Sequence, residues 1–134
     1  MTAQLECGLL DTCVLIDLAS LPQESLPPVS AISMISLAEL HVGVNTATDA
    51  EERAGRTVRL HEVTMTFDAF PFDEVAAQCY GVLYAFVEAA GRNPRPRKMD
   101  LLIAATAMAN KLPLYTRNAN DFKGLERALT VVAV

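Results

Sequence analysis

Short apolar segments alternate with longer helical segments from one end of this chain to the other. The segments 8–11, 29–33, 69–72, 114–116 and 130–134 have the length and composition of buried strands. Between them, the residue pattern predicts helices over 13–19, 35–48, 49–66, 73–90 and 98–110. Strands that alternate with helices form parallel sheets with helices on both faces. We therefore expect an α/β fold, a three-layer α/β/α domain with a central parallel sheet of about five strands, spanning residues 1–134.

Polar residues at the starts of the helices indicate where each begins. Thr12 is predicted to cap the first helix and Asp73 the fourth. For the second helix two caps are available. Ser36 and Glu39 have the spacing of a capping box, whereas Ser33 could cap the same helix and leave Glu39 free.

Composition excludes several classes of function. With 51% hydrophobic and 20% charged residues, the 134-residue chain is too apolar to be disordered. It contains no apolar run long enough for a membrane span and no positively charged N-terminal leader, so we expect a cytoplasmic protein. The net charge of −5 argues against a simple electrostatic nucleic-acid binder. Two histidines and three cysteines without metal-ligand spacing leave carboxylates as the groups that would carry the chemistry.

Four acids stand at the ends of predicted elements. Asp11 follows the first strand, Glu39 lies in the first turn of the second helix, Asp100 lies one turn into an alanine-rich helix, and Asp121 follows the fourth strand. Each has a structural explanation on its own, as a cap, a capping-box partner, a favourable charge at a helix N-terminus or a turn residue. Because ligands bind at the carboxyl edge of a parallel sheet, we expect the four acids to gather there.

Gathered carboxylates need protons or cations to offset their repulsion, which is about 4 kcal/mol for a pair 4 Å apart at an effective dielectric near 20. Oxygen ligands suit Mg²⁺ or Mn²⁺, ions that activate water and stabilise both oxygens of a phosphodiester during displacement. A basic segment precedes one of the acids, within seven residues that contain no acid, and could contact phosphates: Arg92, Arg95, Arg97 and Lys98.

The motifs around these acids resemble those of the PIN-domain ribonucleases, specifically the VapC toxins of type II toxin–antitoxin pairs. The matching segments are 9–17 (LLDTCVLID), 32–43 with its Ala38-Glu39-Leu40, 100–107 (DLLIAATA) and 114–122 (LYTRNANDF). The similarity runs from about residue 8 to the C-terminus. Cys13 stands where serine is more usual in the family, a departure that leaves the carboxylates unchanged.

The resemblance implies a set of roles for the residues of this chain. Asp11 and Asp100 would be the principal Mg²⁺ (or Mn²⁺) ligands, and Glu39 and Asp121 would complete or orient the site. Thr12, Thr116 and Asn118 fall at the family's supporting polar positions. The implied activity is a metal-dependent endoribonuclease that cuts structured RNA, such as tRNA or ribosomal RNA, and inhibits translation. A VapB-like antitoxin would neutralise the toxin. The toxin would form a homodimer or a toxin–antitoxin hetero-oligomer, and no membrane would take part.

Two alternatives remain open from the sequence. A PIN-like module that holds RNA or an antitoxin without cutting would have the same acids. A haloacid-dehalogenase-like phosphatase also carries an acid after its first strand, but that chemistry needs a second aspartate at position 13, where this chain has Cys13.

Overall fold

Five parallel strands form the centre of the molecule. The computed structural model describes residues 6–134, and the predicted α/β/α architecture is confirmed. In spatial order the sheet is β3-β2-β1-β4-β5, so β1 lies in the middle and β3 at an edge. The strands are β1 (Cys7–Leu10), β2 (Val29–Ser33), β3 (Asp68–Phe70), β4 (Leu114–Thr116) and β5 (Val131–Ala133).

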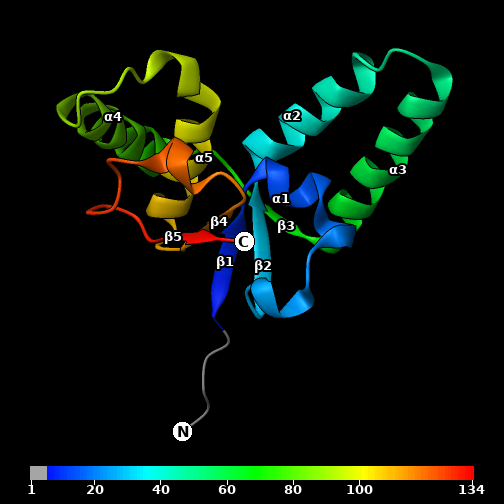
Figure 1. The fold of residues 1–134 in the computed structure, drawn as a ribbon, viewed down its shortest axis with the longest axis horizontal. Coiled ribbons are helices and arrows are strands. Elements are labelled where there is room, and N and C mark those ends of the chain that lie inside the picture. The colour runs from blue at the N-terminus through cyan, green and yellow to red at the C-terminus, as the bar shows by residue number, and fades with distance from the viewer. Residues whose placement is uncertain (1–5) are drawn as a thin grey trace, which may run out of the picture.

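The helices form two arms that diverge from the carboxyl ends of the strands, one carrying α2 and α3 and the other α4 and α5, with the short α1 between them (Figure 1). Their bounds are α1 (Thr12–Ile16), α2 (Met34–Asn45), α3 (Ala50–Thr66), α4 (Glu74–Ala89) and α5 (Lys98–Ala109). The first helix is shorter than predicted, because the chain continues after it as a 3₁₀ turn, Leu18–Ser20.

Alternate residues of the central strands supply two separate cores, one on each face of the sheet. Leu9 and Ala31 pack with α4 and α5, whereas their neighbours Leu10 and Ile32 pack with α1, α2 and α3. Leu9, Leu10 and Ile32 are fully buried. This alternation follows from the two-residue repeat of a strand, and it explains why these strands are apolar at successive positions.

The helix caps decide between the interpretations left open by the sequence. Ser33 caps α2, accepting a hydrogen bond from the Ser36 backbone N–H at 3.0 Å, so Glu39 is free of capping and lies in the second turn rather than the first. The predicted cap at Thr12 is wrong, since Asp11 caps α1 and Thr12 is its first residue. Asp73 caps α4 as predicted.

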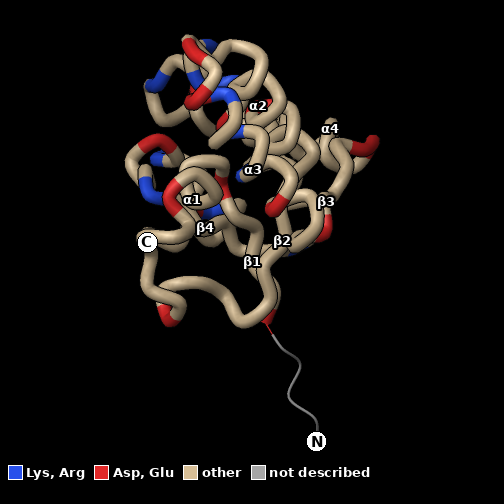
Figure 2. The backbone as a smooth tube through the Cα atoms, turned by 90° about the vertical axis from the view of Figure 1, so that its right-hand side faces the viewer, with Lys and Arg blue, Asp and Glu red and all other residues tan. Residues whose placement is uncertain are grey.

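Acidic and basic residues are intermixed where α2 and α3 lie, at the upper end of the molecule (Figure 2). Within residues 6–134 no helix is both long enough and apolar enough to cross a membrane. The expectation about a secretory leader concerned the N-terminal segment, and residues 1–5 of that segment lie outside the described part of the chain.

Candidate active site

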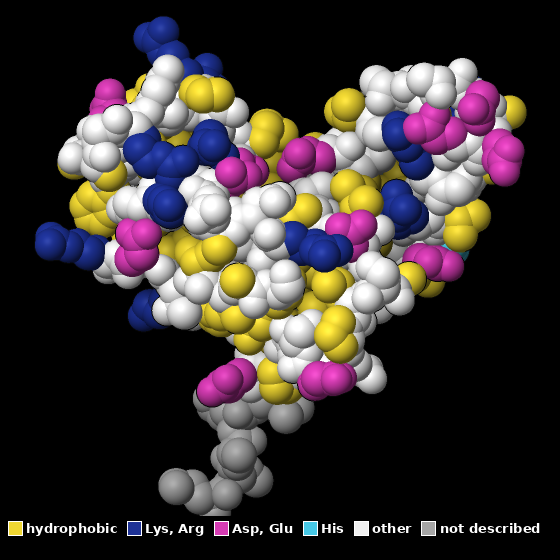
Figure 3. All heavy atoms as spheres, viewed as in Figure 1, with side chains coloured by type: hydrophobic (Ala, Val, Ile, Leu, Met, Phe, Trp, Pro, Cys, Tyr) yellow, Lys and Arg dark blue, Asp and Glu magenta, His cyan; other side chains and the backbone are white. Residues whose placement is uncertain are grey.

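The four acids gather at the carboxyl edge of the sheet, at the base of the space between the two arms. In the space-filling view this space is hollowed, acidic side chains lie at its floor, and Lys and Arg side chains gather on the arm that carries α4 and α5 (Figure 3). We call Asp11, Glu39, Asp100 and Asp121 the acid cluster.

Asp11 is held in place by its own neighbours. Its side chain is buried, with 5% of its surface exposed, directly after β1. One carboxylate oxygen accepts from the Thr12 backbone N–H at 2.8 Å, which caps α1, and the other accepts from the Thr116 hydroxyl at 2.8 Å. Thr116 is fully buried at the end of β4, so a residue 105 positions away fixes the carboxylate. Asp11 therefore caps α1, and the same geometry places its carboxylate in the acid cluster.

A chain of hydroxyl groups fixes Glu39. Thr12 donates to the Glu39 carboxylate at 2.8 Å, and its hydroxyl also lies 2.9 Å from that of Ser36. Ser36 is buried in the first turn of α2, where Ser33 lies within hydrogen-bond distance. Thr12, predicted as a supporting residue, contacts Glu39, whereas Ser36 was considered only as part of a capping box. The three-residue spacing between Ser33 and Ser36 was the sequence signal that could have indicated their contact.

Asp100 lies in the first turn of α5, as predicted, and its ionisation is strongly perturbed. Its pKa is raised from 3.8 to about 6, with burial as the largest cause. The negative charges of the three other members of the acid cluster raise it further, and the Arg97 guanidinium opposes them. The acids are thus close enough to repel one another, and Asp100 is the member on which that repulsion acts most clearly.

Asp121 lies in a 3₁₀ turn after β4 and forms an ion pair with Arg97. Arg97 was predicted as an RNA contact, so the structure adds a partner that the sequence did not indicate. Arg92 is also engaged, donating to the backbone carbonyl of Asn120 at 2.9 Å. The other two basic residues, Arg95 and Lys98, are exposed.

Asn118 supports the site through its backbone. Its N–H donates to the Thr116 hydroxyl at 3.0 Å, and its carbonyl accepts from the Asp121 N–H at 2.9 Å, while the side chain is exposed. Cys13 was not predicted to contribute. Its thiol contacts the Asp11 carboxylate at 3.3 Å, and burial, the largest cause, raises the thiol pKa.

The donor chemistry of the acid cluster fits a divalent cation. Its members offer carboxylate oxygens, the ligands that Mg²⁺ and Mn²⁺ prefer, and a cation would relieve the repulsion that raises the pKa of Asp100. Within residues 6–134, however, no three His, Cys, Asp or Glu side chains form a ready-made metal cage. Glu39 and Asp121 are engaged with Thr12 and Arg97, so these contacts would have to adjust around an ion.

Comparison with known proteins relates this geometry to a family. No family model matches the chain. A curated protein, ribonuclease VapC5 of Mycobacterium tuberculosis, is 36% identical over 127 residues, covering 92% of this chain and 91% of its own. The chain belongs to the VapC ribonuclease family. The resemblance noted in the sequence motifs is therefore confirmed.

Solved structures agree with the VapC assignment. A toxin–antitoxin complex of the VapBC family from M. tuberculosis, VapBC-5, contains a chain that is 35% identical to this one. It matches with a TM-score of 0.85, covering 96% of this chain and 98% of that one. A chain of FitAcB from Neisseria gonorrhoeae matches at 25% identity with a TM-score of 0.67, covering 92% and 94%. The three-layer fold is thus that of VapC toxins.

Proposed function

We propose that this protein is a Mg²⁺-dependent endoribonuclease toxin that cleaves structured RNA, tRNA or ribosomal RNA, in the cytoplasm. The observation that carries the proposal is the acid cluster, in which burial and the charges of the three other carboxylates raise the pKa of Asp100 to about 6. Its support is membership of the VapC family, whose curated relative is named a ribonuclease.

In this proposal Asp11 and Asp100 hold the ion, and Glu39 and Asp121 complete or orient the site. The ion, when bound, supplies Lewis-acid activation of water and stabilises charge on the phosphodiester oxygens. The chain's own residues position these ligands. Thr116 fixes the Asp11 carboxylate from β4, and Thr12 fixes the Glu39 carboxylate from α1. Attack by water rather than by the 2′-hydroxyl would leave a 5′-phosphate and a 3′-hydroxyl. Neither histidine is assigned a role in this proposal.

The proposed partner is a VapB-like antitoxin. The support is that the structure with a TM-score of 0.85 to this chain is of a VapBC complex. We further propose that toxin subunits pair. Co-expression with the antitoxin gene, followed by measurement of the mass of the complex, would test this.

The experiment is cleavage of total bacterial RNA by the purified protein with Mg²⁺ and with EDTA, for the wild type and Asp100→Asn. We expect cleavage only by the wild type with Mg²⁺, and 3′-hydroxyl ends on the products. Equal cleavage in EDTA, or full activity in Asp100→Asn, would remove the metal-dependent mechanism.

A catalytically silent binding module is the second candidate. Two observations favour it, the Arg97–Asp121 ion pair inside the acid cluster and the lack of a ready-made metal cage within residues 6–134. RNA binding by the wild type without cleavage at any Mg²⁺ concentration would establish this candidate instead.

A further inference from the structure

A cavity of about 280 Å³ lies beside the acid cluster, on the arm that carries α2 and α3. Thr12 and Glu39, which belongs to the acid cluster, line this cavity together with Arg56 and Arg59 of α3. Ile16 and Leu40 contribute apolar surface. The cavity therefore joins the acidic floor of the site to two guanidinium groups.

The two arginines differ in what they contact. Arg56 forms an ion pair with Glu52 and donates to the Gly43 carbonyl. Arg59 makes no ion pair and no side-chain hydrogen bond with the residues that the structure describes. Its donors are therefore available to a ligand, whereas those of Arg56 already hold α3 against α2.

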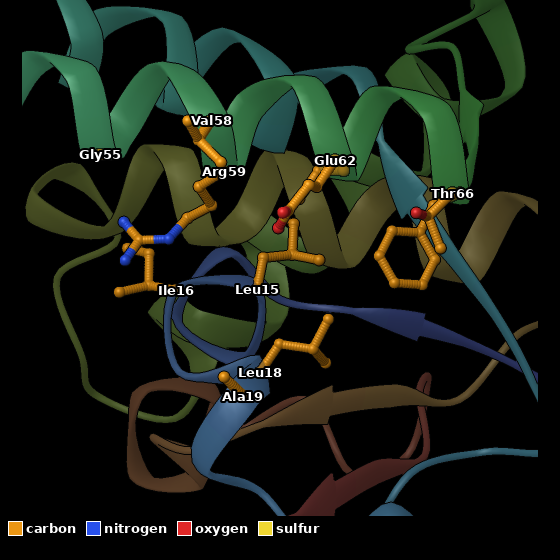
Figure 4. A pocket seen from close by; sticks show the side chains of 11 residues that line it. Leu15, Ile16, Leu18, Ala19, Gly55, Val58, Arg59, Glu62 and Thr66 are labelled. Atoms are coloured by element: carbon orange, nitrogen blue, oxygen red, sulfur yellow. The ribbon is translucent and has the colours of Figure 1, made fainter.

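Arg59 occupies a position on α3 where packing alone favours an apolar residue. It lies four residues before the buried Val63 and is itself partly buried. Figure 4 shows its side chain reaching from α3 toward Ile16 at the end of α1, while Glu62, the nearest acid on the same helix, projects over Leu15. Arg59 and Ile16 line both this cavity and the neighbouring one, so the guanidinium lies at the boundary between the two.

We propose that Arg59 binds a backbone phosphate of the RNA, next to the one that lies at the acid cluster. The inference rests on the proposed nuclease function and adds the residue that holds the strand on the α2–α3 side. A polyanion that crosses four carboxylates needs cations on both sides to offset the repulsion. On the α5 side Arg97 already pairs with Asp121, and on the α3 side Arg59 provides a cation without such a pair among the described residues. A guanidinium suits this role because its planar fork matches two oxygens of a phosphate.

The test compares Arg59→Gln with Arg53→Gln. Both residues lie on α3 and carry the same charge, but Arg53 is exposed and does not line the cavity. Each change is made in the full chain together with Asp100→Asn, so that RNA is not consumed. The measured quantity is the dissociation constant for labelled bulk tRNA at several salt concentrations, with thermal unfolding of each variant to confirm folding.

We expect Arg59→Gln to weaken binding and to lower the slope of log affinity against log salt by about 0.7–0.9, the value for one lost phosphate contact. The ratio of the dissociation constant of the Arg59→Gln variant to that of the Asp100→Asn protein without it then falls about threefold between 50 and 200 mM salt. Arg53→Gln should change the slope much less, and Arg59→Lys should restore most of it. A protein whose fold was merely loosened would not show this selective change in slope.

Other outcomes overturn the inference separately from the proposed function. If Arg59→Gln and Arg53→Gln give the same slope while the wild type still cleaves RNA, Arg59 is not a phosphate ligand and the nuclease proposal stands. If Arg59→Gln leaves RNA binding intact but releases a co-expressed antitoxin, Arg59 belongs to a protein interface. If the Asp100→Asn protein does not bind RNA and the wild type does not cleave it, the proposed function fails together with this inference.

Discussion

Replacing Asp100 by asparagine should stabilise the metal-free protein at neutral pH. In the folded chain the pKa of Asp100 is raised from 3.8 to about 6, so holding the ionised carboxylate in place opposes folding. A shift of about two pKa units corresponds to about 3 kcal/mol. Because the carboxyl group is only half-buried, solvent screens part of this, and we expect a gain of about 1–2 kcal/mol.

The gain should depend on pH in a defined direction. Below pH 3.8 the carboxyl group is protonated in the folded and unfolded chain alike, and Asp100→Asn should change little. Between pH 3.8 and about 6 the unfolded chain loses its proton while the folded chain keeps it, so the wild type becomes progressively less stable. Above about pH 6 the full difference is present.

The measurement is thermal unfolding in EDTA at pH 4 and pH 7.5. We expect Asp100→Asn to raise the melting temperature by about 4–8 °C at pH 7.5, with a smaller rise at pH 4. Asp68→Asn is the matched control, because Asp68 is exposed on the edge strand β3. Addition of Mg²⁺ should stabilise the wild type but not Asp100→Asn. A rise of the same size at both pH values, or a fall at pH 7.5, would refute the reasoning.

Two further changes test the fold and the electrostatics. Gly8→Ala places a methyl group 2.5 Å from the Tyr115 ring, and should destabilise the protein by about 1–3 kcal/mol in urea unfolding. Gly81→Ala should not destabilise the protein, because nothing lies within 4 Å of the added methyl group. Equal losses of unfolding free energy in the two variants would contradict the steric argument. Arg97→Gln removes the cation that lowers the pKa of Asp100, so that pKa should rise above about 6 in an NMR titration of the carboxyl carbon. An unchanged or lower value would show that Arg97 does not act on this carboxylate.

The order and type of the elements could be predicted because each strand and helix has its own local pattern. Apolar residues at successive positions, such as Leu9 and Leu10, indicate a strand buried on both faces, and the structure places these two side chains in different cores. Boundaries were less predictable. The first helix ends at Ile16 although Leu18 continues the apolar pattern, because the chain tightens into a 3₁₀ turn in which Leu18 still packs on the same core.

The positions of the four acids followed from topology, whereas their contacts did not. Parallel strands bring their carboxyl ends to one edge, and the early turns of α2 and α5 lie at the same edge, so acids at these places come near one another. Which group binds each acid depends on pairings between distant residues. Thr116 and Asp11 are 105 positions apart, and no local pattern links them. The ion pair of Arg97 with Asp121 depends in the same way on how α5 approaches the turn after β4.

Asp11 and Asp100 should respond oppositely in stability although both are proposed to bind the same ion. Asp11 caps α1 and accepts from Thr116, so its carboxylate is stabilised by contacts that the fold requires. Removing them in Asp11→Ala should cost about 1–2 kcal/mol, the range for a lost helix cap. Asp100 does not cap its helix, and the charges around it are mainly repulsive. Both variants should lose Mg²⁺-dependent cleavage, but in EDTA at pH 7.5 Asp11→Ala should melt below the wild type and Asp100→Asn above it. If both variants melt below it, the burial and repulsion at Asp100 do not oppose folding, and the acid cluster is a structural feature rather than a strained binding site.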